Sequence, residues 1–173
     1  MTSTPTTSPT LATWTTTVDS PVGPLLLTTN GTGLTRLLFD VPPDHTWSTD
    51  PHPVLEEVVR QLAEYFAGER TEFELELAPH GTEFQRRVWG LLLEIPYGET
   101  RTYGSLAGEL GNPRSVRAVG LANGRNPISI VVPCHRVIGA DGTLVGYGGG
   151  LERKRALLAH EAEVAAGFRA TLW

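Results

Sequence analysis

The sequence predicts a mixed α/β (α+β) protein, with a small N-terminal antiparallel sheet and one helix, then a mostly helical C-terminal half containing a helix-turn-helix. Short β-rich runs broken by turn signals occupy residues 14–39, an amphipathic stripe follows, and helical patterns dominate after residue 81. We therefore expect an N-terminal α/β domain over residues 14–80 and a C-terminal domain over 81–173. Residues 1–13, rich in Thr, Ser and Pro, are predicted to be a flexible tail.

The N-terminal elements follow from turn and periodicity signals. The turns "SPVG" and "NGTG" separate three predicted strands at Thr15–Asp19, Pro24–Thr29 and Leu34–Phe39, and "NG" between apolar runs is a strong hairpin signal. After a proline-rich loop, a helical stripe ends at Gly68, with apolar residues Val54, Leu55, Val58, Val59, Leu62, Tyr65 and Phe66. The alternation in "FELELAP" predicts one more strand, over 73–79.

The C-terminal half begins with a predicted helix over 82–95, for which Thr82 can serve as the N-cap. The turn "PYGET" leads to two short helices, over 102–110 and 114–124, separated by "GNP"; these are the dimensions of a helix-turn-helix. The β-branched run "ISIVV" predicts a buried strand over 128–132, and Pro133 ends its ladder because proline lacks an N–H. A glycine-rich loop, 140–150, precedes the last helix, 151–162.

Composition limits the class of protein. With a single cysteine among 173 residues the chain forms no intramolecular disulfide, which favours a reducing, cytoplasmic location. One sulfur cannot supply a thiolate-rich metal site, and we expect no metal and no cofactor. The sequence holds no run of eighteen apolar residues, so no membrane span is expected.

Charge divides the chain unequally. Residues 1–81 carry three arginines against eleven acids, and residues 82–173 carry eleven Lys and Arg against eight acids. A basic C-terminal half fits contacts to a nucleic-acid backbone, and it also fits ordinary surface scatter. The small residues Ala118, Gly120 and Ala122 allow the second short helix to approach either a neighbouring helix or a nucleic-acid groove. Arg117 and Arg125 project from this helix, and Arg114 projects from the turn before it.

Cys134 lies in "VVPCHRV", directly after the predicted strand. A lone cysteine is most often an inert core residue, but a position just beyond a strand end is where loops carry function, and we expect an exposed thiol. A free thiol has a pKa of about 8.5 and needs a proton acceptor to react at neutral pH. His135 is the adjacent candidate base, and Glu161 is a candidate to orient it, at a distance that the spacing leaves open.

Four segments, in order, resemble the O6-alkylguanine-DNA alkyltransferases, also called methylated-DNA–protein-cysteine methyltransferases. They are "FQRRVWGLLLEIPYGETRTYGSLA", "SVRAVGLANGRNPISIVVPCHRVIG", "G-x-L-x-GYGGG" and "K-x-x-LLAHE". The resemblance covers residues 84–161 strongly and 18–78 loosely, where "SPVGPLLLTT" is similar to the start of the family's N-terminal domain. It implies a ribonuclease H-like N-terminal domain and a stoichiometric repair protein whose partner is duplex DNA with alkylated bases. A monomer in solution, with clustering on DNA, is expected.

The resemblance also implies residue roles. Cys134 accepts the alkyl group, His135 reaches the thiol through a water, Glu161 orients the imidazole, and Asn126 braces the strand against the helix-turn-helix. Arg117 is inserted into the stack that the flipped base leaves, while the Tyr103 side chain crowds the phosphate. The Tyr103 hydroxyl and the Val137 N–H become donors to the leaving guanine. The base-pocket and DNA-contacting set further comprises Val137, Tyr147, Gly148, Lys154, Thr102, Ala118 and Asn123.

Two departures from the family pattern affect these expectations. Gly148 replaces the serine of several relatives, which predicts a more tolerant pocket that admits bulky alkyl groups or O4-alkylthymine. The chain also lacks the cysteines that hold zinc in the N-terminal domain of some relatives.

Three other functions use the same residues. A cysteine hydrolase would turn over repeatedly and need an oxyanion hole, for which "VVPCH" provides no helix N-terminus. A non-catalytic module that binds alkylated DNA would lack the reactive cysteine, which this chain keeps. A helix-turn-helix regulator would need neither the predicted strand nor the thiol.

Overall fold

The N-terminal half is a three-stranded antiparallel sheet covered by one helix. The structure is a computed structural model that describes residues 13–40 and 47–170. Strands β1 (Trp14–Val18), β2 (Leu25–Thr29) and β3 (Leu34–Leu38) pair in the order β1-β2-β3, each within one residue of its predicted bounds. The predicted tail, except for Thr13, lies outside the described residues.

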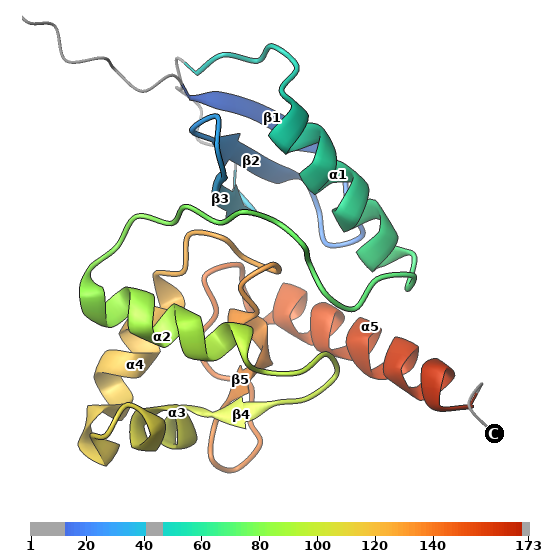
Figure 1. Ribbon diagram of the computed structural model, residues 1–173. Coiled ribbons are helices and arrows are strands. Elements are labelled where there is room, and N and C mark those ends of the chain that lie inside the picture. The colour runs from blue at the N-terminus through green and yellow to red at the C-terminus, as the bar shows by residue number, and fades with distance from the viewer. Residues whose placement is uncertain (1–12, 41–46, 171–173) are drawn as a thin grey trace, which may run out of the picture.

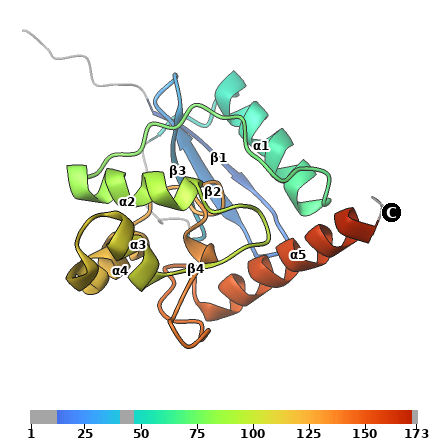
Figure 2. The same ribbon diagram turned by 60° about the horizontal axis from the view of Figure 1, so that its bottom comes forward.

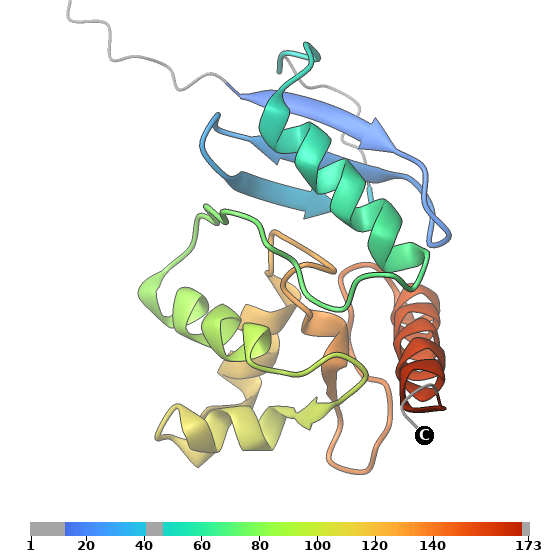
Figure 3. The same cartoon turned by 45° about the vertical axis from the view of Figure 1, so that its right-hand side comes forward.

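Helix α1 (Pro53–Phe66) lies across this sheet (Figures 1 and 3). The His52 side chain caps it by accepting from the Val54 N–H, and Pro53 fits its first turn, where an N–H is not needed. The helix ends just before Gly68, as predicted. Gly68 has a φ of 75°, a conformation that is costly for other residues. Its buried face includes Leu55, Val58, Leu62 and Tyr65.

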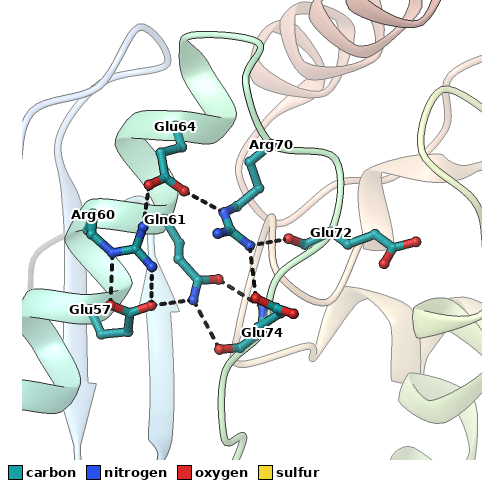
Figure 4. Close-up of polar contacts among 7 residues, drawn as sticks. All are labelled: Glu57, Arg60, Gln61, Glu64, Arg70, Glu72 and Glu74. Carbon is teal, nitrogen blue, oxygen red and sulfur yellow. Dashed lines mark hydrogen bonds and ion pairs between the residues drawn. The ribbon is translucent and has the colours of Figure 1, made fainter.

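The predicted strand over 73–79 is wrong for most of its length. The Gln61 side chain takes the place of a neighbouring strand, because its Oε1 accepts from the Glu74 N–H at 2.9 Å and its Nε2 donates to the Glu74 carbonyl at 3.0 Å. Figure 4 shows this pairing beside the Glu57, Arg60, Glu64 and Arg70 charges. Within the segment only Leu77 forms a β-bridge, with Leu34.

The C-terminal half is mostly helical (Figure 2). Its main helices are α2 (Glu83–Leu93), α3 (Tyr103–Glu109), α4 (Val116–Gly124) and α5 (Leu151–Ala170). Thr82 caps α2 as predicted, in a reciprocal capping box with Gln85. Helix α5 extends beyond the predicted bounds of 151–162, whereas α3 and α4 agree closely with the two predicted short helices.

The two short helices pack against each other through a tight connection. The 3-10 turn η1 (Pro113–Ser115) joins α3 to α4, and Asn112 caps it. Strands β4 (Arg101–Thr102) and β5 (Val137–Ile138) form a short parallel pair that holds the start of α3 beside the segment after Cys134. The mixed α/β class with a helix-turn-helix geometry is thereby present.

The predicted strand over 128–132 is wrong, although its apolar residues are buried as expected. The chain folds instead into consecutive turns, in which the Val131 N–H donates to Ser129 O at 2.8 Å and the Val132 N–H to Ile128 O at 3.0 Å. Ile130 has a φ of 69°, a left-handed conformation that β-branched residues rarely adopt. β-branched composition predicted extended backbone, and local side-chain hydrogen bonds override it here.

The two halves share one continuous apolar core. Backbone hydrogen bonds also join the two halves. The Leu37 N–H donates to Pro127 O at 2.9 Å, and the Ser129 N–H donates to Leu37 O at 3.0 Å. Gly149 packs so closely on Phe39 that a Cβ there would lie 2.4 Å from the ring. Among the described residues, no helix is both long enough and apolar enough to cross a membrane.

Candidate active site

Cys134 begins the 3-10 turn η2 (Cys134–Arg136) and is 4% exposed, so the expectation of an exposed thiol is wrong. Asn126 Nδ2 donates to Cys134 Sγ at 3.0 Å and to the Val132 carbonyl at 2.8 Å, while Asn126 Oδ1 accepts from the Ile128 N–H at 3.0 Å. Burial raises the pKa of the thiol, and the Asn126 donor and the Lys154 charge oppose that rise.

His135 and Glu161, 26 residues apart in sequence, meet in the core. His135 Nε2 lies 2.7 Å from Glu161 Oε1, and both side chains are fully buried. Burial raises the pKa of Glu161, but contacts with His135 and Arg136 outweigh it and hold that pKa at about 2. An ionised carboxylate only accepts hydrogen bonds, so Nε2 carries the imidazole proton. The lone pair is then on Nδ1, which is buried and has no partner among the described residues.

Three further groups converge on Glu161 that the sequence analysis did not include. Arg136 donates from Nε to Oε2 at 2.8 Å and from Nη2 to Oε1 at 3.0 Å, and its Nη1 binds the Ile95 carbonyl at 2.6 Å. The Tyr65 hydroxyl donates to Oε1 at 2.8 Å, and the Gly98 N–H to Oε2 at 3.2 Å. Arg136 is part of the motif "PCHRV", so the sequence offered a signal for it. Tyr65 belongs to the apolar stripe of α1, and that stripe identified it only as a core residue.

A cavity of about 420 Å³ lies between α4 and the glycine-rich loop. Its lining comprises Tyr103, Val116, Gly120, Gly124, Val145, Gly146, Tyr147 and Gly148. The Tyr103 hydroxyl donates to the Val145 carbonyl at 3.2 Å. The volume falls in the range of small-molecule sites, and so many glycines leave the walls open to a flat aromatic group.

Lys154 is fully buried below this loop. Its Nζ donates to Val137 O at 2.6 Å and to Val145 O at 3.1 Å, and burial lowers its pKa. The Val137 N–H, expected to face a substrate, donates to Cys134 O in this structure. Gly148 is exposed, and a Cβ added there would meet Gly124 O at 3.5 Å, an ordinary contact.

The remaining sequence-predicted residues lie on the helix-turn-helix. Thr102 caps α3 by accepting from the Ser105 N–H at 3.1 Å. Arg117 and Ala118 are exposed on α4, and Arg117 has no ion pair among the described residues. Asn123 is buried on the inner side of α4, where its Nδ2 donates to Cys134 O at 3.4 Å and its Oδ1 has no partner in the described part of the chain. Asn123 therefore links helix α4 to the backbone of Cys134.

A helix-turn-helix set beside a buried cysteine, next to an imidazole–carboxylate pair, is the arrangement of a DNA-binding domain with a candidate nucleophile. Residues 83–163 match the model of the 6-O-methylguanine DNA methyltransferase DNA binding domain, and residues 14–79 match that of its ribonuclease-like domain. The chain belongs to the methylated-DNA–protein-cysteine methyltransferase family, and it is a DNA-repair methyltransferase with a DNA-binding domain.

Individual relatives are similar to this chain along most of their length. The chain is 58% identical over 146 residues to a methylated-DNA–protein-cysteine methyltransferase of Mycobacterium tuberculosis, covering 82% of this chain and 88% of the relative. A Methanosarcina acetivorans enzyme of the same name is 53% identical over 147 residues, covering 81% and 92%. The crystal structure of Mycobacterium tuberculosis OGT in complex with DNA has a TM-score of 0.82 at 56% identity, covering 87% of this chain and 94% of that one.

Proposed function

We propose that the protein flips O6-alkylguanine out of duplex DNA and transfers its alkyl group irreversibly to Cys134, in one turnover. The observation that carries the proposal is the position of the buried thiol. It accepts from Asn126 Nδ2, and the next residue, His135, pairs with Glu161. The thiol interacts electrostatically with Tyr103 and Tyr147, which line the cavity beside the helix-turn-helix. In the reaction the sulfur attacks the alkyl carbon, the bond from that carbon to the guanine oxygen breaks, and the alkyl group stays on the protein as a thioether.

The thiol proton goes to His135. Burial lowers the pKa of His135, so the imidazole is neutral and can act as a base, and its free nitrogen is Nδ1. As the imidazolium forms, the Glu161 carboxylate stabilises it through Nε2. Asn126 donates to the sulfur and favours the thiolate over the thiol.

DNA is bound through α3 and α4. The exposed Arg117 fills the gap left by the extruded base, Ala118 packs in the minor groove, and the N-terminal end of α3 at Thr102 contacts the backbone. The glycine-rich cavity takes the base, which lies against Tyr147 and Gly148. Because Gly148 leaves space in its wall, bulky alkyl groups and O4-alkylthymine also enter.

Guanine leaves more easily when a donor meets its oxygen or ring nitrogen. The Tyr103 hydroxyl and the Val137 N–H are the donors, and each exchanges its present acceptor, Val145 O or Cys134 O, for the base. Lys154 and Asn123 hold the loop and α4 in place around the base. The protein works as a monomer in the cytoplasm, where its thiol stays reduced, and clusters along DNA.

The test is incubation with a duplex that contains one O6-methylguanine, followed by peptide mass spectrometry. We expect one methyl group on the Cys134 peptide per protein, no second turnover, and complete loss in Cys134→Ser. The proposal is refuted if each protein transfers many methyl groups, or if no methyl group reaches the protein. Binding to the lesion without transfer would support a non-catalytic alkylated-DNA-binding module instead.

The DNA roles are tested separately with Arg117→Ala. We expect a large loss of rate on paired duplex and almost none on free O6-benzylguanine, because only the duplex requires a flipped base. Equal losses on both substrates would remove Arg117 from base extrusion. Arg155→Ala is the matched control, since Arg155 is an exposed arginine on α5.

A further inference from the structure

The C-terminal end of α1, in the N-terminal half, is fixed against α5. Tyr65 is fully buried there, with ring centroids 5.1 Å from Phe66, 5.4 Å from Phe73, 5.9 Å from Tyr97 and 5.2 Å from His160. His160 Nε2 also donates to the Tyr65 carbonyl at 2.8 Å. Tyr65 is therefore held by its ring and by its backbone at once, which leaves its hydroxyl little freedom.

That hydroxyl is directed at the carboxylate of the candidate active site. It lies 2.8 Å from Glu161 Oε1 across 96 residues of sequence. Burial and the Glu161 charge raise the pKa of Tyr65, so the phenol stays protonated and donates a hydrogen bond. The same oxygen accepts from His135 Nε2 at 2.7 Å and from Arg136 Nη2 at 3.0 Å. Three donors thus share one oxygen.

We propose that Tyr65 is a positioning residue for alkyl transfer, by which the N-terminal half orients Glu161 and limits how strongly that carboxylate binds the His135 imidazole. The inference rests on the proposed function. Each donor on Oε1 draws on the same lone-pair density, so removing the Tyr65 donor strengthens the bond to His135. A stronger bond to Glu161 stabilises the imidazolium, so at low pH more of His135 is already protonated and less neutral imidazole is left to accept the thiol proton.

Other groups around the imidazole are accounted for. Glu161 and Lys154 face it from α5, and Arg136 faces it from η2. The Tyr65 and Tyr97 hydroxyls lie beyond Glu161. Burial, Arg136 and Lys154 lower the pKa of His135, and Glu161 raises it. The Tyr65 hydroxyl contacts Glu161 directly, so we expect a change at Tyr65 to reach His135 mainly through that carboxylate.

The experiment compares Tyr65→Phe with Tyr97→Phe in the full chain. Both variants remove one buried hydroxyl from the same aromatic cluster, but the Tyr97 hydroxyl has no partner among the described residues. Rates of methyl transfer from an O6-methylguanine duplex are measured against pH, with thermal unfolding as a check on folding. For Tyr65→Phe we expect the acid limb of the pH–rate profile to move up by about half a pH unit. This shift corresponds to a part of the free energy that one charge-assisted hydrogen bond contributes. We expect the plateau rate to fall roughly threefold to tenfold, the factor that one misplaced hydrogen bond carries.

A second perturbation keeps the hydroxyl and works in the opposite direction. A meta-fluorotyrosine at position 65 donates more strongly, competes better with His135 for Oε1, and should move the acid limb down. This variant retains both the ring and the hydrogen bond, so it tests the inference even where Tyr65→Phe folds poorly.

Two results overturn the inference. One is a Tyr65→Phe pH profile that matches Tyr97→Phe, and the other is a fluorinated protein whose acid limb stays in place or rises. Failure of the proposed function gives a different result, since the unmodified protein would then transfer no methyl group to Cys134 at any pH.

Discussion

Replacing Asn126 by alanine removes the side chain that holds residues 128–134 in consecutive turns. The buried Ile128 N–H loses the Asn126 Oδ1 acceptor, its only partner in the described part of the chain. The Val132 carbonyl loses one of two donors, because the Cys134 N–H still reaches it at 2.8 Å. An unsatisfied buried group costs about 1–3 kcal/mol, and the left-handed Ile130 loses part of what maintains it, so we expect a loss of about 2–4 kcal/mol.

The assay has two readouts. Urea unfolding gives the free energy of unfolding, and the pH dependence of thiol alkylation by iodoacetamide gives the pKa of Cys134. That pKa should rise in Asn126→Ala, because the donor at 3.0 Å that opposes burial is gone.

Asn112→Ala is the control, since Asn112 caps the exposed turn η1 through the Arg114 N–H and should cost about 1 kcal/mol without affecting the thiol. A loss below about 1 kcal/mol in Asn126→Ala, or a thiol pKa equal to that of the control, would refute this account of the turn.

The remaining predictions concern Glu161 and three glycines. Because the pKa of Glu161 is about 2 when folded and 4.5 ordinarily, its contribution of roughly 3 kcal/mol is present above pH 4.5 and is lost as pH falls toward 2. Acid unfolding curves should show this loss, and Glu161→Gln should flatten it; an unchanged slope would contradict the buried-carboxylate assignment. Gly149→Ala should cost about 1–3 kcal/mol in urea unfolding, because its Cβ meets Phe39 at 2.4 Å. Gly90→Ala, on the exposed side of α2 with nothing within 4 Å, should gain about 0.5–1 kcal/mol, and a similar result for both would show that the Phe39 contact is soft. Gly148→Ser should change stability by no more than about 0.5 kcal/mol, since its Cβ makes only an ordinary contact. In competition assays it should slow benzyl transfer more than methyl transfer, and equal slowing would mean that this wall does not select by size.

Elements with local signals could be predicted from the sequence. Thr82 and Gln85 form the capping box at the start of α2, and Gly68 adopts the positive φ expected where α1 ends. Such features depend on residues three or four positions apart, which a single sequence displays directly.

Features that depend on distant side chains could not be predicted. The run "ISIVV" is β-branched and buried, yet Asn126 supplies the hydrogen bonds that a neighbouring strand would have made. In the same way Gln61 substitutes for a strand beside Glu74. A period-two pattern reports burial on alternate sides and does not specify which groups satisfy the backbone.

In the candidate site, too, the residues with a local sequence signal could be predicted, and the contacts between distant side chains could not. His135 and its expected partner Glu161 are brought together, and Cys134 begins the turn that holds His135, while the assignment of their roles stays a prediction. The burial of Cys134 differs from expectation because distant side chains, those of Asn126, Tyr147 and Lys154, surround the sulfur. Tyr65 lies 96 residues from Glu161 within an ordinary apolar stripe, and no local pattern distinguishes it from its core neighbours.

The burial of Lys154 affects how the protein's surface charge can be modified. Lys154 is the only lysine of the chain, and its ammonium group is enclosed by the Val137 and Val145 carbonyls. Every cationic side chain that the described residues expose is therefore a guanidinium, which keeps its charge at any physiological pH. Acetylation, which weakens lysine-rich DNA-binding surfaces by removing charge, finds no accessible side-chain amine here.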